Sequence, residues 1–335
     1  MPTDISIMFP EFTNLICQTY FFWMYDIWVE QDWQKITQVV PSTKAAEFYP
    51  TLAAPPKMDQ WQGARRFFPA GEKYAYSVLN AKYDTGIEIE RSAFQDDQYG
   101  ILMKKISDLA VEGKRKPMEL AYNIINYGAI SNTTNANYCV GPDNQPLFSA
   151  SHPGKIDISP SDTQSNDYGL TGLTTANLIS VVAGMKKIYD NQGRPMGILP
   201  DTLLVPPDLE ATALGLLNSQ WFMSVAPGGS SGTPTTATTG IPTFNVFNAA
   251  QPNSLLKQII STPYITDSAA WYVACTTRPA KPVMLQERMP PELTIKMDPN
   301  TSDKVFDTDN IYASVLARWG AAPGDWHTIA RGAHS

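Results

Sequence analysis

Two periodicities of hydrophobic and polar positions follow one another between Trp61 and Gly128. From residue 74 to residue 89 the two kinds of side chain alternate at every second position, which is typical of β-strands. From residue 99 to residue 125 apolar side chains recur every three or four positions, which indicates a helix with one apolar face. The stretch predicts a long β-hairpin joined without a linker to a long helix. Because two strands alone are marginally stable in water, we expect the hairpin to lie on another surface, most simply a second copy of the chain.

The tip of this predicted hairpin is the leading candidate for a contact with another subunit. The turn candidates are the run 69–71 and the pair 80–81. Arginine and aromatic residues are enriched at the cores of interfaces. The alternative is a hairpin that folds on its own domain and leaves its arginines in water. Two adjacent arginines and two adjacent phenylalanines lie near the first turn: Arg65, Arg66, Phe67 and Phe68.

The long helix has recognisable start, stop and break signals. Ser92 and Gln95 have the spacing of a capping box at the start, and Gly128 is expected to end the helix. Pro117 is expected to kink or restart it, because proline lacks the N–H group and crowds the preceding turn. The basic run 114–116 next to it is more simply a solvated or intersubunit charge than a DNA contact, since the whole chain is acidic.

An aromatic helix is predicted near the N-terminus, from about residue 12 to about residue 34. One face of this helix is an apolar stripe, and its other faces carry further aromatic residues. That is more aromatic surface than one packing stripe requires. We therefore expect an arm that lies across other subunits, with Trp23 and Trp28 as contact candidates; the alternative is an ordinary core helix. The proline-rich segment up to residue 56 is expected to be extended chain with little regular structure. The predicted apolar stripe of the helix consists of Phe12, Leu15, Ile16, Thr19, Trp23 and Ile27.

The rest of the chain predicts a second lobe and a closing sheet, hence an α+β fold. Residues 130–172 have the composition of a long loop, and 280–331 return to period two, which indicates an antiparallel sheet packed on the long helix. The run 226–240 is rich in Gly, Ser and Thr and lacks the lysine of a phosphate-binding loop. The second lobe lies between the long loop and the closing sheet. We expect it to contain a helix capped near Thr174, a buried strand at 201–207, a helix from Asp208 to about Leu217, and strands at about 244–247, 257–260 and 271–275.

Composition and charge narrow the class of protein. The chain has 335 residues, of which 43% are hydrophobic and 17% charged, against about 25% charged in typical soluble domains. Such a surface fits subunits covered by neighbours, although a monomer with a neutral polar surface remains equally compatible. The net charge of −7 excludes a general electrostatic attraction to nucleic acid.

Cysteine usage and hydropathy exclude two further classes. The three cysteines, Cys17, Cys139 and Cys275, are far apart and odd in number, which argues against a disulfide framework, so each is expected to be a small buried apolar group. The acidic N-terminus is unlike a secretory signal. The aromatic segment 15–29 is interrupted by polar residues and is shorter than the about 20 residues that span a membrane.

Candidate catalytic chemistry is sparse. His152 invites attention, but no second histidine or carboxylate stands at the sequence spacing of a ligand set or dyad, and His327 lies far along the chain. We expect a loop histidine that packs against backbone, no cofactor, no metal and no enzyme activity. A hydrolase that uses His152 or Cys139 is the least favoured hypothesis, because no set of acid, base and nucleophile can be assembled.

The order of several segments resembles one known family, the Mu-like prophage major head subunits (gpT-type capsid proteins), which have the fold of the bacteriophage Hong Kong 97 major capsid protein. The resemblance covers nearly everything after about residue 30. It implies an N-terminal arm (1–56), an extended loop (57–92), a peripheral domain with a spine helix (93–172 and 279–335) and an axial domain (173–278). The segments are QDWQKITQVVPSTKAAEFYP, WQGARRF, YAYSVLNAKYDTGIEIERSAFQDDQYGI, LFSASHPG, LLVPPDLEATALGLL and KPVMLQERMPPELTIKMDPNTSDKVFDTDNIYASVLARWG.

The resemblance also implies partners and a place. It implies hexamers and pentamers that form an icosahedral shell around double-stranded DNA, with portal, separate scaffolding and decoration proteins as further partners, assembly in the bacterial host cytoplasm and a final place in the virion. We expect only weak, non-specific DNA contact, no membrane contact and no isopeptide cross-link. The alternative is an encapsulin-like shell of the same fold around protein cargo.

Overall fold

The chain folds into two compact units, each with its own sheet and helices, so the predicted α+β class is confirmed. A computed structural model of the chain describes residues 10–27, 32–52, 58, 60–61, 63, 72–92, 101–129, 140–154, 162–224, 241–248, 254–300 and 302–333. The first unit comprises residues 1–49, 76–123 and 284–322, and the second comprises 50–75, 124–283 and 323–335.

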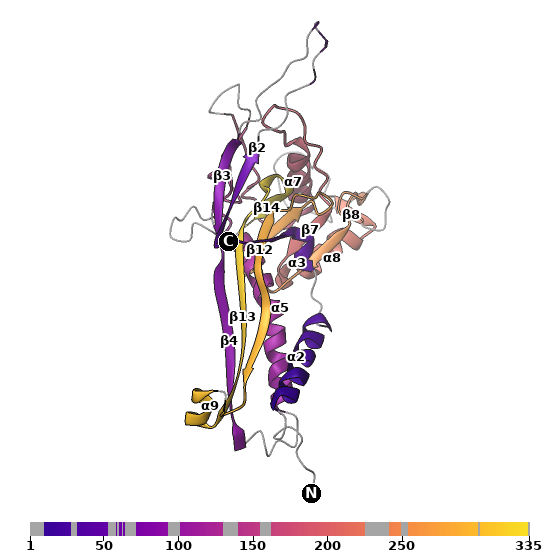
Figure 1. The fold of residues 1–335 in the computed structure, drawn as a ribbon. Coiled ribbons are helices and arrows are strands. Elements are labelled where there is room, and N and C mark those ends of the chain that lie inside the picture. The colour runs from indigo at the N-terminus through magenta and orange to yellow at the C-terminus, as the bar shows by residue number, and fades with distance from the viewer. Residues whose placement is uncertain are drawn as a thin grey trace. The chain divides into compact units, whose positions relative to one another are not determined.

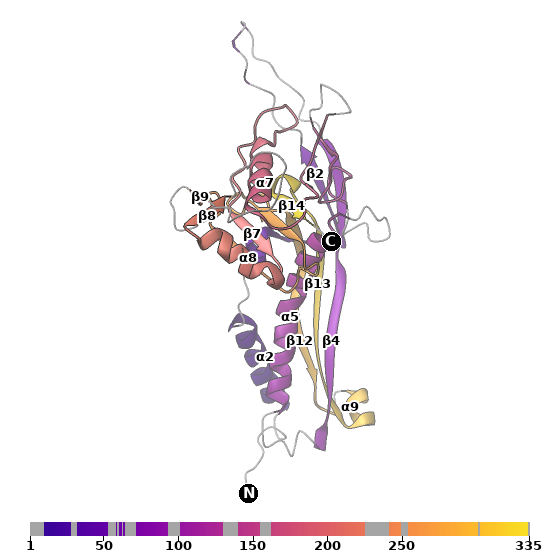
Figure 2. The ribbon, with the colours of Figure 1, turned by 180° about the vertical axis from the view of Figure 1, so that it is seen from behind.

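The first unit is built on a four-stranded sheet in the order β1-β12-β13-β4 (Figures 1 and 2). Strand β13 pairs antiparallel with β4 over ten residue pairs, from Asn310 opposite Glu90 to Trp319 opposite Ala81. The antiparallel sheet predicted for the last part of the chain is thus present in β12 and β13. The strands are β1 (Thr37–Pro41), β4 (Ala81–Glu90), β12 (Val283–Lys296) and β13 (Asn310–Pro323).

Helices α2 (Pro10–Ile27) and α5 (Ile101–Asn126) lie side by side and share the core of the first unit with that sheet (Figures 1 and 2). Alternate residues of β12 and β13 point into this core, as the period of a strand requires. The buried members are Cys17 and Phe21 of α2, Ile106, Leu109 and Ala110 of α5, Leu293 and Ile295 of β12, and Ile311, Ala313 and Val315 of β13.

Helix α5 is the predicted long helix, with one correction. It runs without a break through Pro117, so the predicted restart is wrong. It ends at Asn126, and Gly128 lies in the turn that follows, where the Gly128 N–H donates to the Ile125 carbonyl. The capping box falls partly on Gln95, which lies outside the described residues. The predicted N-terminal helix is described as α2 up to Ile27 and as a short helix, α3 (Asp32–Ile36), on the other side of residues 28–31, which lie outside the described residues.

The hairpin is made of different strands from those predicted. Strand β3 (Glu72–Leu79) pairs with β2 (Ala46–Leu52) and not with β4, so no turn is formed at residues 80–81. The segment expected to be irregular therefore contains β1 and β2. Its prolines fit because Pro41 is the last residue of β1, which is an edge strand, and Pro50 lies in β2, whose sheet has two strands.

The second unit has a four-stranded sheet in the order β10-β7-β11-β14. Strands β10 and β7 are parallel, whereas β11 is antiparallel to both β7 and β14. Every residue of β7 and β11 is buried, as expected for central strands covered on both faces. The strands are β7 (Thr202–Val205), β10 (Gln258–Ser261), β11 (Trp271–Ala274) and β14 (Ile329–Ala333).

Two helices of the second unit follow their sequence signals. Helix α7 (Thr175–Lys187) begins after Thr174, whose hydroxyl accepts a hydrogen bond from the Asn177 N–H at 3.2 Å. Helix α8 (Pro207–Asn218) begins with proline at its first position, where the missing N–H costs nothing.

The second unit also corrects three strand assignments. Strand β14 was expected beside β12 and β13 but pairs with β11. The strand predicted at 244–247 is instead β9 (Ile241–Phe244), which ends where that prediction began and pairs with β8 (Trp221–Ser224), a strand that was not predicted. The loop 226–240 lies outside the described residues. The short elements are β5 (His152–Pro153), β6 (Thr163–Gln164), α9 (Asp303–Thr308) and the 3-10 turn η2 (Trp326–Thr328).

Cys17 and Cys275 are free and buried, as predicted, whereas Cys139 lies outside the described residues. Burial raises the pKa of the Cys17 thiol to about 11, which makes it a poor nucleophile. Among the helices of the described residues, none is long and apolar enough to cross a membrane.

Candidate functional site

Helix α2 exposes an apolar face that is opposite to the face it buries. Phe21 is fully buried against α5, whereas Trp23, two positions further on, is 56% exposed. The stripe expected to be buried is therefore partly the exposed one, because Leu15 and Ile16 are 59% and 40% exposed. A shallow, almost entirely apolar hollow of about 370 Å³ lies on this face, lined by Leu15, Ile16, Thr19, Tyr20 and Trp23.

Trp23 is the one predicted contact residue that lies within the described part of the chain, and it is exposed as an assembly contact must be. The other five, Trp28, Arg65, Arg66, Phe67 and Phe68, lie outside the described residues. Sequence reasoning did not select Leu15, Ile16 and Tyr20 as surface residues, because it assigned Leu15 and Ile16 to the helix's buried stripe.

The base of the hairpin is fixed by a buried asparagine. The Asn80 side-chain amide donates to the Ser42 hydroxyl at 2.7 Å and to the Lys44 carbonyl at 2.9 Å, and the Asn80 N–H donates to the Ala45 carbonyl. Asn80 is 6% exposed, so these bonds replace those that its N–H groups would make with water, whereas its side-chain oxygen is buried without a hydrogen-bond partner. The residue predicted to be a turn instead connects β3 and β4 and holds the segment between β1 and β2.

Glu47, at the start of β2, closes the same segment. Its carboxylate accepts hydrogen bonds from the Thr43 N–H at 2.9 Å and the Lys44 N–H at 3.0 Å. These two backbone hydrogen bonds lower the pKa of the Glu47 carboxyl. The bend before β2 is thus held by Glu47 and by Asn80, which fixes the base of the hairpin.

Two tyrosines pack across the hairpin next to this base. The rings of Tyr49 in β2 and Tyr76 in β3 have centroids 5.9 Å apart. The Gln286 side chain of β12 donates to the Tyr49 hydroxyl at 2.6 Å. Burial raises the pKa of Tyr76 well above its usual value. The hairpin is therefore anchored to the first unit's sheet through side chains as well as backbone.

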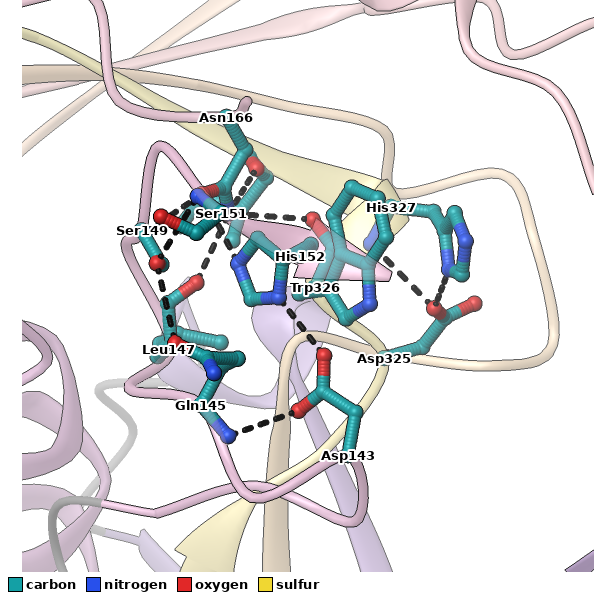
Figure 3. A network of polar contacts seen from close by, with 11 residues as sticks. Asp143, Gln145, Leu147, Ser149, Ser151, His152, Asn166, Asp325, Trp326 and His327 are labelled. Carbon is teal, nitrogen blue, oxygen red and sulfur yellow. Dashed lines mark hydrogen bonds and ion pairs between the residues drawn. The ribbon is translucent and has the colours of Figure 1, made fainter. Parts of the chain in front are cut away.

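A second cluster of chemistry-bearing residues lies inside the second unit, around His152 (Figure 3). His152 is fully buried, and its Nδ1 lies 2.7 Å from Asp143 Oδ2. Its ring stacks on Trp326 with centroids 4.0 Å apart and planes within 5°. His327 stacks on Trp326 as well, with centroids 3.8 Å apart. Figure 3 shows Trp326 between the two histidines, so the three rings form a column. We call His152, Trp326 and His327 the ring column.

The ring column brings His152 together with a carboxylate and a second histidine, although neither stands at the sequence spacing of a ligand set or dyad. Asp143 is nine residues away in sequence, in an irregular loop, and His327 is brought in by η2. No fixed spacing connects such residues, so no sequence motif could have found them. The ring of His152 is inaccessible, and both of its nitrogens are occupied, by Asp143 and Asn166.

His327 forms its own pair with Asp325, whose side chain also accepts the His327 N–H at 3.2 Å. Burial alone would raise the pKa of the Asp325 carboxyl, but the hydrogen bond and charge of His327 outweigh it, and the pKa is lowered. Within the described residues, no group of three or more His, Cys, Asp and Glu side chains could hold a metal ion.

The fold itself has counterparts among solved structures. The structure of the bacteriophage JBD30 capsid matches with a TM-score of 0.50 at 19% identity, over 71% of this chain and 92% of that chain. The chain therefore has the fold of phage major capsid proteins, the Hong Kong 97-like fold.

The family of the chain follows from comparison of its sequence with known proteins. The model of the Mu-like prophage major head subunit gpT family matches residues 25–172, 170–233 and 249–334. The chain belongs to this family, as the resemblance in its sequence predicted. The Mu-like prophage FluMu major head subunit of Haemophilus influenzae is 30% identical over 146 residues, and the major capsid protein of Escherichia phage Mu is 27% identical over 121 residues. These matches span 43% and 36% of this chain, and 44% and 37% of the two relatives.

Proposed function

We propose that this chain is a major capsid protein that self-assembles into hexamers and pentamers of an icosahedral phage head. The observation that carries the proposal is the family match, which extends over most of the chain from residue 25 to residue 334. The fold of phage capsid proteins and the exposed apolar face of α2 support it. The encapsulin-like alternative is not favoured, because the matched family consists of prophage head subunits.

The proposal assigns roles along the chain. Residues 1–56 are the arm, 57–92 the extended loop, 93–172 with 279–335 the peripheral domain, and 173–278 the axial domain. The extended loop reaches a neighbouring subunit, and its fixed base at Asn80 supports this role because a projecting hairpin needs a rigid origin. Arg65, Arg66, Phe67 and Phe68 at its tip, with Trp23 and Trp28 of the arm, are the proposed intersubunit contacts.

Further partners and the place of assembly follow from this role. The shell forms in the cytoplasm of a bacterial host, joins a portal and separate scaffolding and decoration proteins, and encloses double-stranded DNA in the virion. DNA contact is weak and non-specific, because the subunit carries a net charge of −7. The role is structural rather than enzymatic, which the enclosed state of His152 supports.

Electron microscopy of the purified full chain tests the proposal. Negative staining of the expressed protein, at increasing concentration, should reveal closed shells, tubes or separate rings of six and five subunits. A chain that stays monomeric at all concentrations, with and without a co-expressed scaffolding protein of the same phage, would contradict it. Shells that enclose a specific protein and never DNA would favour the encapsulin-like cargo compartment instead.

A further inference from the structure

The protonation of His152 can be derived from the hydrogen bonds around it, beginning with Asn166 (Figure 3). The Asn166 side-chain nitrogen faces three backbone carbonyls, those of Leu147 at 2.7 Å, Ile329 at 3.2 Å and Trp326 at 3.3 Å. A nitrogen must occupy this position, because only a donor can bond to carbonyl oxygens. The Asn166 side-chain oxygen is therefore on the other side, where it accepts the Ser149 N–H at 3.0 Å.

That oxygen fixes one hydrogen on the imidazole. His152 Nε2 lies 3.2 Å from Asn166 Oδ1. Because an amide oxygen only accepts, Nε2 must carry a hydrogen. A neutral imidazole has one N–H, so a neutral His152 would leave Nδ1 bare.

Asp143 requires a second hydrogen. His152 Nδ1 lies 2.7 Å from Asp143 Oδ2, a distance that needs a hydrogen between the two atoms. The other oxygen of Asp143 accepts the Gln145 N–H at 3.2 Å, so this oxygen carries no hydrogen of its own toward Gln145. Both ring nitrogens of His152 then donate, and the ring is a cation. The face of Trp326, 4.0 Å away, suits a cation because an indole face carries negative potential.

We propose that His152 and Asp143 form a proton-dependent latch, in which a positively charged His152 closes the loop at 140–154 through its bond to Asp143 and holds that loop against Trp326 of the C-terminal segment at 325–333. Loss of the proton places a bare nitrogen against a carboxylate oxygen where the two side chains are 1% and 9% exposed, so water cannot replace the lost bond. The loop should therefore loosen as the pH rises. The latch is a property of the folded chain and does not rest on capsid assembly.

The surrounding charges define what else could titrate. Among the described residues, the charged or titratable groups against the ring column or its carboxylates are Asp143, Asp325, His327 and Arg278, and the ion pair of Asp167 with Arg331 lies next to Asn166 along the chain and through a backbone bond. Of these, only His327 is a second histidine, the residue type whose model side chain changes charge near about pH 6.5. His327 is also the more exposed of the two histidines, with 23% of its side chain accessible. Any test must separate these two histidines.

Hydrogen–deuterium exchange with mass spectrometry tests the latch on the full chain. Protection of peptides from 140–154 and 325–333, corrected for the intrinsic exchange rate, should fall at least about tenfold between about pH 6 and about pH 9. The matched control is Asp143→Asn. Its amide N–H can donate to Nδ1 of a neutral ring and its oxygen can still accept the Gln145 N–H, so its protection should not depend on pH. His327→Asn should keep the pH dependence of the unaltered chain.

Three results would overturn the latch: protection that does not change with pH, pH dependence that persists in Asp143→Asn, or pH dependence that disappears in His327→Asn. Should Asp143→Asn fail to fold, a direct measurement decides. Nitrogen-15 spectra of the histidine-labelled chain near about pH 7 should show both ring nitrogens of His152 bearing hydrogen, with His327→Asn and His334→Asn used to assign the signals. A bare nitrogen in His152 at that pH would refute the proposal.

Discussion

The most enclosed ion pair of the described residues after that of His152 joins Asp167 to Arg331 of β14. The Arg331 guanidinium donates to both oxygens of the Asp167 carboxylate, with Nε at 3.0 Å from Oδ1. The same guanidinium lies over the ring of Phe148, 5.6 Å from its centroid. The backbone contributes a further hydrogen bond, from the Tyr168 N–H to the Arg331 carbonyl at 3.0 Å. The pair therefore fastens β14 through side chain and backbone together.

Replacing Asp167 by Asn should reduce the free energy of unfolding by about 1.5–3 kcal/mol, because the buried Arg331 guanidinium loses a charge-assisted bond. Urea denaturation of the unassembled chain measures this. The matched control is Asp32→Asn, which breaks the exposed pair with Lys35, whose side chains are 45% and 53% accessible. That change should cost about 0.5 kcal/mol or less. Equal effects of the two substitutions would contradict the assigned role of burial.

His152 illustrates how little of such a site a sequence can reveal. Its pairing with Asp143 depends on a loop that is held by Asn166, a residue whose side chain bonds to three backbone carbonyls in two separate segments. No periodicity encodes that arrangement. By contrast, the burial of Cys17 and Cys275 was predicted correctly, because a lone cysteine in an apolar context is ordinarily buried.

At the scale of elements, α2 carries two aromatic residues with opposite environments, and they separate stability from assembly. Phe21→Ala should reduce the free energy of unfolding by about 3–5 kcal/mol, since Phe21 is fully buried against α5. Trp23→Ala should change it by about 0.5 kcal/mol or less, since Trp23 is 56% exposed, yet it should reduce shell formation. Urea denaturation and electron microscopy measure the two effects. A Trp23→Ala chain that assembles normally would remove α2 from the proposed contacts.

The hairpin gives the second prediction at this scale. Replacing Arg65 and Arg66 together by Glu should prevent shell formation while leaving circular dichroism and thermal unfolding unchanged, because the substitutions reverse the charge proposed to meet a neighbour's carboxylates. The matched control is the double replacement of Lys104 and Lys105 by Glu on α5. These two side chains are exposed, and the net charge changes equally, so a general effect of charge would appear in both variants. Normal heads from the arginine variant would contradict the proposed role of the tip.

Helices and strands were predicted well where one hydrophobic period persists along the sequence. They were predicted poorly where the structure depends on which strand or helix lies next to the element. Helix α5 follows from its apolar spacing, the Thr174 cap placed α7, and α8 begins one residue before the predicted Asp208. The partner of β3 could not be predicted, because the alternating pattern is equally compatible with β2 or β4 as a neighbour. The buried face of α2 was misjudged for a similar reason, since apolar residues occur on several of its faces.

At the scale of the whole molecule, the order of the strands along the chain differs from their distribution between the two sheets. Strand β14 at the C-terminus joins the sheet of the second unit, whereas β12 and β13 immediately before it belong to the first. The chain thus passes between the two units several times. Because each unit is closed by segments distant in sequence, we expect neither to fold when expressed as one continuous fragment.

The charge of the whole chain leads to a last prediction, on DNA. A subunit with a net charge of −7 has no general attraction to phosphate, so local lysines and arginines alone can contact a packaged genome. The unassembled chain should bind double-stranded DNA more weakly than about 10⁻⁶ M at physiological salt, and any binding at low salt should disappear steeply as salt is added. Fluorescence anisotropy of a labelled duplex measures this, with the Lys104 and Lys105 double replacement as a comparison for an exposed basic pair. Micromolar or tighter binding at physiological salt would mean that a concentrated basic surface overrides the acidic total.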